Sequence, residues 1–298
     1  MFKQRFVVGA LALGCIVGST NVAQASEWVV LRTNVDARSF AGDWLVSTDK
    51  VEGHNDYYVK YWAGTQYLTD TASSGLGTSY VAGTTITVGP DLIPAMIRAD
   101  GHVFRRDQAS TTWHPYPQTK CGISGSFSAR RSNGTLRSYL ASGFGSTTPT
   151  LFAVAEGATD SDIYYFNSAG SCWQKTSGAY EQISISATGV IWGVTAAKTL
   201  ARYTVATDTW TPYVASYLQP NKIEGGTLFA VHTTQHPPVI IWTSYGTDWN
   251  EWDDTWAQYT TVLPSAVAEF WDKPNPDFQA MLVYSQTDRF VRVWTASD

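Results

Sequence analysis

Aromatic and acidic side chains are concentrated in one short stretch of the chain, residues 248–256. The stretch contains three tryptophans and four acidic residues in the order Asp-Trp-Asn-Glu-Trp-Asp-Asp-Thr-Trp. An aromatic ring offers an apolar face to a sugar ring, while nearby carboxylates and amides bind sugar hydroxyl groups. We therefore predict a ligand-binding platform made by Tyr245, Trp249, Trp252, Asp253 and Asp254. The alternative is that the tryptophans pack between sheets and the acids are solvated in a turn.

No catalytic residue is predicted. Glycoside hydrolysis needs two carboxylates about 5–10 Å apart, and the acids near expected strand ends include no pair that spacing singles out. These acids are Asp43, Asp100, Glu156, Glu181, Glu224 and Glu269. The sequence also contains no Gly-x-Ser-x-Gly nucleophile motif and no phosphate-binding glycine loop.

Metal binding is not expected either. His232 and His236 are four positions apart, which would align them on a helix, but Pro237 and Pro238 follow directly and disfavour one. The acidic residues 248–254 lack the spacing and the glycine of a calcium loop. We expect no metal and no cofactor.

Two cysteines, Cys121 and Cys172, lie beyond the first 25 residues. In an oxidising compartment they can form a disulfide, and otherwise they would be buried thiols. Spacing leaves both outcomes open, because a disulfide requires Cα atoms within roughly 7 Å.

The elements that position these residues are expected to be β-strands. The chain is rich in Trp, Tyr, Thr, Gly and Val, and charged residues make up 15%. Aromatic and β-branched residues fit a pleated, half-buried surface, and glycine supplies tight turns. Helical periodicity longer than two turns is absent. The sequence therefore predicts an all-β fold.

The clearest strand pattern covers residues 180–214. Apolar and polar residues alternate in four short segments that are separated by turns of two or three residues, which is typical of an antiparallel meander. The segments are 182–187, 190–194, 200–205 and 210–213.

A spacing rule repeats this unit along the chain. An apolar residue is followed ten positions later by Trp at Val103/Trp113, Ile163/Trp173, Leu200/Trp210 and Val239/Trp249. Four-stranded units with a period near 40 residues are typical of propeller blades. We predict a single β-propeller and favour six blades. The longer interval between the first two units, which contains Asn133-Gly134, is either an insertion within one long blade or a shortened seventh blade. A two-sheet sandwich would not explain the repeat.

The two ends of the chain are expected to share a blade. Residues 43–48, 57–62 and 66–69 have the pattern of a first blade, and residues 266–271, 278–284 and 290–294 supply three strands of a last one. The segment 27–31 lies apart from the other strands. We predict that it is the missing fourth strand of the last blade, which would close the ring and cover open sheet edges.

The segment Thr188-Gly-Val-Ile-Trp-Gly-Val194, followed by Tyr203 and Trp210, resembles the tectonin repeat over about 35 residues. Asp100 to Arg105 keeps the turn and third strand of that repeat without the preceding Trp-Gly-Val. Tectonin-type proteins are lectin-like propellers, so the resemblance implies a carbohydrate-binding module.

The first 25 residues are expected to be an export signal. Lys3 and Arg5 precede an apolar stretch, and Ala23-Gln-Ala25 offers a cleavage site. The propeller domain would then occupy residues 26–298, and the protein would be secreted to the extracellular space or the periplasm. No later stretch is apolar enough to span a membrane.

The charge distribution excludes one class of partner. The net charge is −5, and Lys and Arg are scattered apart from two pairs, which argues against a nucleic-acid surface. We predict a non-enzymatic propeller that binds glycans or cell-surface polysaccharide. The alternatives are a protein-interaction scaffold and a polysaccharide-cleaving glycoside hydrolase.

Overall fold

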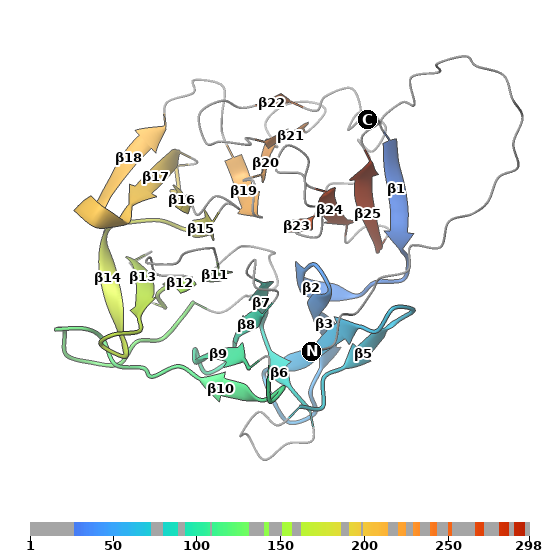
Figure 1. Cartoon of the computed structure of the whole chain (residues 1–298), viewed down its shortest axis with the longest axis horizontal. Helices are drawn as coiled ribbons and strands as arrows, with labels where there is room; N and C mark the ends of the chain where they lie inside the picture. Colours follow the sequence, from blue (N-terminus) through green and yellow to red (C-terminus); the bar gives the residue numbers. More distant parts are fainter. Residues whose placement is uncertain are drawn as a thin grey trace, which may run out of the picture.

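The protein consists of short antiparallel sheets arranged around a central axis (Figure 1). The computed structural model describes residues 27–72, 80–88, 93–107, 109–130, 140–142, 151–156, 162–185, 191–197, 199–213, 220–224, 229–232, 239–242, 250–251, 266–270, 280–285 and 289–295. Within these residues the regular structure is β-strand, apart from one 3-10 turn, η1 (Val205–Thr207). The prediction of an all-β fold is confirmed.

Four sheets are described with side chains. The first contains β2 (Ala37–Ala41), β3 (Trp44–Lys50), β4 (Tyr57–Trp62) and β5 (Tyr67–Thr69), with the short β6 (Ala82–Gly83) beside β4. The second contains β7 (Thr85–Val88), β8 (Pro94–Ile97), β9 (Val103–Arg106) and β10 (Trp113–Pro115). The third contains β11 (Leu140–Ser142), β12 (Leu151–Val154), β13 (Asp162–Asn167) and β14 (Cys172–Ala179). The fourth contains β15 (Gln182–Ile185), β16 (Ile191–Val194), β17 (Leu200–Thr204) and β18 (Thr209–Tyr213).

Two further sheets are described mainly through their backbone pairing. One contains β19 (Pro220–Glu224), β20 (Phe229–His232), β21 (Val239–Trp242) and β22 (Asn250–Glu251). The other contains β23 (Ala266–Phe270), β24 (Ala280–Ser285), β25 (Phe290–Thr295) and β1 (Glu27–Arg32). Consecutive strands pair antiparallel in every sheet, which confirms the predicted blades of a propeller.

The ten-residue spacing rule has a simple structural basis. In three blades the tryptophan of the outermost strand pairs with the residue three positions after the apolar residue that begins the count. These pairs are Trp113↔Arg106, Trp173↔Phe166 and Trp210↔Tyr203. An offset of ten is therefore the length of one strand, its turn and the entry to the next strand.

The N-terminal strand completes the last sheet, as predicted. β1 pairs antiparallel with β25, and Glu27, Trp28 and Val29 lie opposite Thr295, Trp294 and Val293. Figure 1 shows β1 (blue) beside β25 (red), so the two ends of the described chain share one blade.

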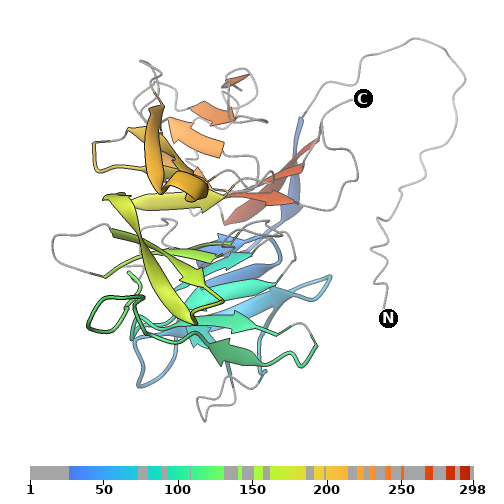
Figure 2. The ribbon, with the colours of Figure 1, turned by 60° about the vertical axis from the view of Figure 1, so that its left-hand side comes forward.

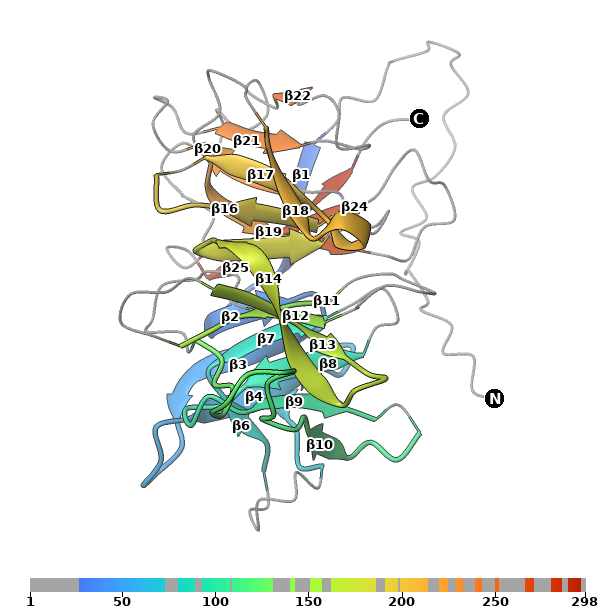
Figure 3. The same ribbon diagram turned by 90° about the vertical axis from the view of Figure 1, so that its left-hand side faces the viewer.

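The innermost strands form a continuous set of contacts around the axis. β2 contacts β7, β7 contacts β11, β11 contacts β15, β15 contacts β19, β19 contacts β23, and β23 contacts β2. Neighbouring blades also meet at their outer strands, because the long β14 reaches β18 of the next blade (Figure 3). Figure 2 shows how the strands of successive sheets fan out around the ring. The number of blades, six or seven by the sequence, stays a prediction.

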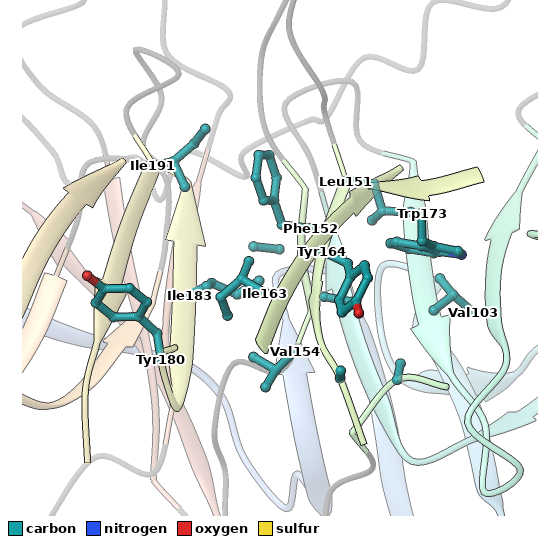
Figure 4. Close-up of a cluster of buried hydrophobic side chains, with 14 of the residues drawn as sticks. Val103, Leu151, Phe152, Val154, Ile163, Tyr164, Trp173, Tyr180, Ile183 and Ile191 are labelled. Atoms are coloured by element: carbon teal, nitrogen blue, oxygen red, sulfur yellow. The ribbon is translucent and has the colours of Figure 1, made fainter. Parts of the chain in front are cut away.

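The hydrophobic core lies between blades rather than inside one sheet. Phe152, Val154 and Ile163 of the third blade face Ile183 and Ile191 of the fourth blade (Figure 4), and all five side chains are buried. A twisted sheet buries both faces only when a neighbour covers each one. Alternation along these strands therefore separates the side chains that contact the preceding blade from those that contact the following blade.

The long interval between the second and third blades is partly an inter-blade connection. Lys120 forms a parallel bridge with Trp173, and Thr119 forms an antiparallel bridge with Ser126, so this segment lies along the outer edge of β14. The described part, residues 116–130, forms neither an insertion inside one blade nor the strands of a seventh. The Asn133-Gly134 pair lies outside the described residues.

Candidate functional site

The residues predicted to bind a ligand lie outside the part of the chain that the structure describes. They are Tyr245, Trp249, Trp252, Asp253 and Asp254. The carbohydrate platform therefore stays a prediction.

Two of the four tryptophans at the repeated position, Trp113 and Trp173, are structural. Trp113 and Trp173 are each 1% exposed. Trp113 Nε1 donates to Asp70 Oδ2 at 2.9 Å, and Trp173 Nε1 donates to the Pro117 carbonyl at 2.9 Å. The first hydrogen bond leads to the end of the first blade and the second to the connection that follows the second blade, so both rings are buried in junctions and unavailable to a ligand.

The described side chains of the segment with the tectonin-like pattern are also packed in the interior. Trp192 is fully buried, and a Cβ on Gly193 would lie 2.7 Å from both Trp210 and Tyr180. The rings of Tyr180 and Trp210 have centroids 3.9 Å apart. Glycine follows Trp192 because these two rings occupy the space that a side chain would need.

The same type of contact recurs where one blade meets the next. Asp70, just after the outermost strand β5, binds Trp113 and contacts Arg106 of the second blade at 3.4 Å. Ser177 in β14 donates its backbone N–H to Asp208 of the fourth blade at 2.9 Å. The end of an outermost strand therefore attaches to the outer hairpin of the following blade.

Asp208 organises the junction between the third and fourth blades. Tyr203 Oη donates to Asp208 Oδ1 at 2.7 Å. Burial raises the pKa of the Tyr203 phenol, and the hydrogen bond to Asp208 raises it further. Asp208 has φ of +48°, in the left-handed region, which Asp tolerates better than most residues. The neutral phenol is therefore the form that the fold stabilises.

Arg32 makes the corresponding contact at the junction that closes the ring. The residue is 5% exposed and lies at the end of β1. Its guanidinium forms an ion pair with Asp43 at 2.5 Å and donates to the Gly42 carbonyl at 3.1 Å and to the Tyr67 hydroxyl. It also lies over the Trp62 ring, 4.4 Å from the centroid. This side chain attaches the closing strand to the first blade, a role that no local sequence pattern predicts.

A β-bulge aims Arg32 inward. Val30 pairs with Arg292 and Arg32 pairs with Val291, so Leu31 is an extra residue on β1. Strict alternation would place Val30 and Arg32 on one face. Instead Val30 and Leu31 are 43% and 47% exposed while Arg32 is buried. The bulge thus leaves two consecutive aliphatic side chains on the surface.

The contacts of the described residues do not bring two of the candidate acids together as a catalytic pair. Asp43 is paired with Arg32, while Asp100 contacts Arg98 at 3.5 Å and His102 at 3.1 Å. Glu156 and Glu181 also have interactions of their own. The side chains of the remaining two candidates, Glu224 and Glu269, lie outside the description.

The structure offers no metal centre among the residues it describes, where no three His, Cys, Asp or Glu side chains are grouped. His232 ends strand β20, and His236 lies outside the described residues. In the same part of the chain no helix has the length and apolarity needed to cross a membrane.

Cys121 and Cys172 form a disulfide with a Cα–Cα distance of 5.2 Å. The bond joins the connection after the second blade to the start of β14. The loop that follows Cys121 contains Gly122 and Gly125 with φ of +65° and +92°, and it exposes Ile123 by 46%. Glycine permits the tight turns that return this loop to the edge of β14.

These features define a β-propeller in which several of the described polar groups join neighbouring blades. A scan against protein-family models and a search of curated proteins gave no match. Among solved structures, the chain is similar to YCF48 bound to D1 peptide, with 12% identity, a TM-score of 0.50 and coverage of 91% of this chain and 97% of that one. It is also similar to YCF48 from Cyanidioschyzon merolae, with 11% identity, a TM-score of 0.46 and coverage of 86% and 80%. TolB from Acinetobacter baumannii matches with 12% identity and a TM-score of 0.45, over 81% of this chain and 60% of that one. The likeness to the peptide-bound YCF48 shows the propeller fold, and no match shows a tectonin family.

Proposed function

We propose that this protein is a non-enzymatic β-propeller that binds a protein partner. The observation that carries the proposal is the fold match over nearly the whole of both chains to a propeller whose structure contains a bound peptide. A fold does not by itself fix a function, so the proposal also depends on the surface of this chain.

The described buried carboxylates support a protein-binding role rather than a catalytic one. The buried carboxylates Asp56 and Asp70 both hold neighbouring blades together. Asp56 accepts the backbone N–H of Ala99 at 2.6 Å, and Asp70 accepts the indole N–H of Trp113. Both carboxylates therefore serve structural contacts between the first and second blades.

The proposed ring has six blades and is closed by β1. Support comes from the cycle of contacts that leads from β2 through β7, β11, β15, β19 and β23 back to β2. A closed ring leaves no open blade at either end and presents two faces and an outer rim to partners.

The proposal includes export. The apolar stretch after Lys3 and Arg5 supports a cleaved signal over residues 1–25, and the Cys121–Cys172 disulfide is of the kind that persists in oxidising compartments. The protein would therefore act outside the cytoplasm.

Two assays in parallel test the function. The full-length protein, expressed with its own leader, is used to capture partners, and each captured protein is purified and titrated back. A glycan array is probed with the same protein and with Trp252→Ala. We expect saturable binding of a purified protein and no retained glycan. Binding of a purified glycan that is lost in Trp252→Ala would instead establish the carbohydrate platform, and release of reducing sugar would establish a hydrolase.

A further inference from the structure

The outermost strands of the blades differ in how their free edges are protected. An unpaired strand edge can recruit another extended chain unless it is short, contains proline or is covered. β5 has only three residues. Pro115 ends β10, and Pro212 lies within β18. The edge of β14 is covered by the connection that bridges Lys120 to Trp173.

Among the described residues, none of these protections is found at β1. It is six residues long, has the sequence EWVVLR and contains no proline. One side pairs with β25, and the other side pairs with no strand of the described chain. Exposed aliphatic side chains at Val30 and Leu31 accompany this open edge. An uncovered edge beside apolar side chains is the arrangement that strand addition uses.

The bulge limits how long the edge is. Uninterrupted pairing with β25 extends from Glu27 to Val30, and Arg32 is then turned into the junction with the first blade. Four residues of strand extend about 14 Å. This length suits a short peptide ladder.

We propose that the outer edge of β1 binds an extended segment of the partner protein by strand addition, with an apolar side chain of that segment against Val30 and Leu31. The inference rests on the proposed protein-binding function. Backbone hydrogen bonds to β1 would supply affinity, and the two aliphatic side chains would select apolar, β-branched residues in the partner. A symmetric pairing of two copies through β1 is less suitable, because the surface that four residues can bury falls well short of the roughly 800 Å² that each partner buries in a stable interface.

The probe is a phage-displayed heptapeptide library selected on the full-length protein. Enriched peptides are synthesised and titrated by fluorescence polarisation against wild type, Leu31→Lys and Ile123→Lys. Leu31 and Ile123 are 47% and 46% exposed, so both substitutions should leave the fold intact, which circular dichroism verifies. We expect binding to weaken by about tenfold or more in Leu31→Lys and to be unchanged in Ile123→Lys. Bound peptide should slow amide hydrogen exchange at residues 27–30.

Several results would overturn the inference. They are the absence of any enriched peptide, equal binding to all three proteins, or exchange protection confined to other strands. A concentration-dependent dimer that Leu31→Lys abolishes would identify a second copy as the occupant instead. A captured protein that binds Leu31→Lys as tightly as wild type would refute strand addition at β1 and leave the proposed function standing. Failure to capture any protein that binds when purified would refute the proposed function itself.

Discussion

Replacing Arg32 with methionine should weaken the closing junction of the ring. Methionine keeps most of the side-chain volume but loses the ion pair with Asp43 and the hydrogen bonds to Gly42 and Tyr67. Removing one partner of a buried ion pair costs about 3–5 kcal/mol. The Asp43 side chain is 34% exposed, so water can solvate it after the substitution. We therefore expect the free energy of unfolding to fall by about 2 kcal/mol.

The chain offers a matched control at the same closure. Arg289 and Asp36 also form an ion pair between the two ends of the chain, but their side chains are 46% and 43% exposed. An exposed pair contributes about 0–1 kcal/mol, so Arg289→Met should change stability by less than half as much as Arg32→Met. Urea denaturation followed by tryptophan fluorescence measures both variants.

A double-mutant cycle separates the ion pair from the packing of Arg32. We expect Arg32→Met and Asp43→Asn together to be less destabilising than the sum of the single changes, by about 1 kcal/mol. The reasoning would be refuted by an Arg32→Met protein as stable as wild type, or by Arg289→Met with the larger effect. Strict additivity would show that Arg32 acts independently of Asp43, through its contacts with Gly42, Tyr67 and Trp62.

Three further predictions concern the junctions between blades. Replacing Cys121 and Cys172 with serine removes a cross-link between residues with a sequence separation of 51. The chain-entropy model predicts that the free energy of unfolding then falls by about 4 kcal/mol. A thermal unfolding midpoint that neither this change nor reductant alters would argue against the bond. Tyr203 has a raised pKa in the fold, so its contribution to stability is complete below the unfolded pKa of about 10 and is lost as pH rises above it. Wild type should therefore lose stability above this pH more steeply than Tyr203→Phe, and parallel curves of unfolding free energy against pH would contradict the assignment. Gly193→Ala should lose about 1–3 kcal/mol, because the added Cβ meets Trp210 and Tyr180, whereas an unchanged denaturation midpoint would mean that these rings move freely.

Local sequence patterns predicted the repeated parts of the fold well. Alternation between residues 180 and 214 identified all four strands of one blade, and the tryptophan offset identified equivalent hairpins in others. These features depend on contacts between residues close in sequence. β2 was missed, because Ala37–Ala41 is short and contains Arg38 and Ser39, which interrupt the apolar pattern.

Contacts between distant segments could be predicted only in part. The unpaired segment 27–31 indicated the closing strand, since the last blade lacked a partner for it. The inward turn of Arg32 could not be predicted, because it depends on a bulge and on the position of Asp43 in another blade. The disulfide could not be predicted either, because sequence spacing does not give a Cα–Cα distance.

Pairing of β1 with β25 can be measured directly with engineered cysteines. Val29 lies opposite Val293, whereas Val291 is opposite Arg32. Under mild oxidation, a protein with Val29→Cys and Val293→Cys should form a new disulfide, detected by mass spectrometry of its peptides alongside the native Cys121–Cys172 bond. The offset pair Val29→Cys and Val291→Cys should remain reduced. Bonding of the offset pair in preference, or of neither pair in a folded protein, would contradict closure of the propeller by its N-terminal strand.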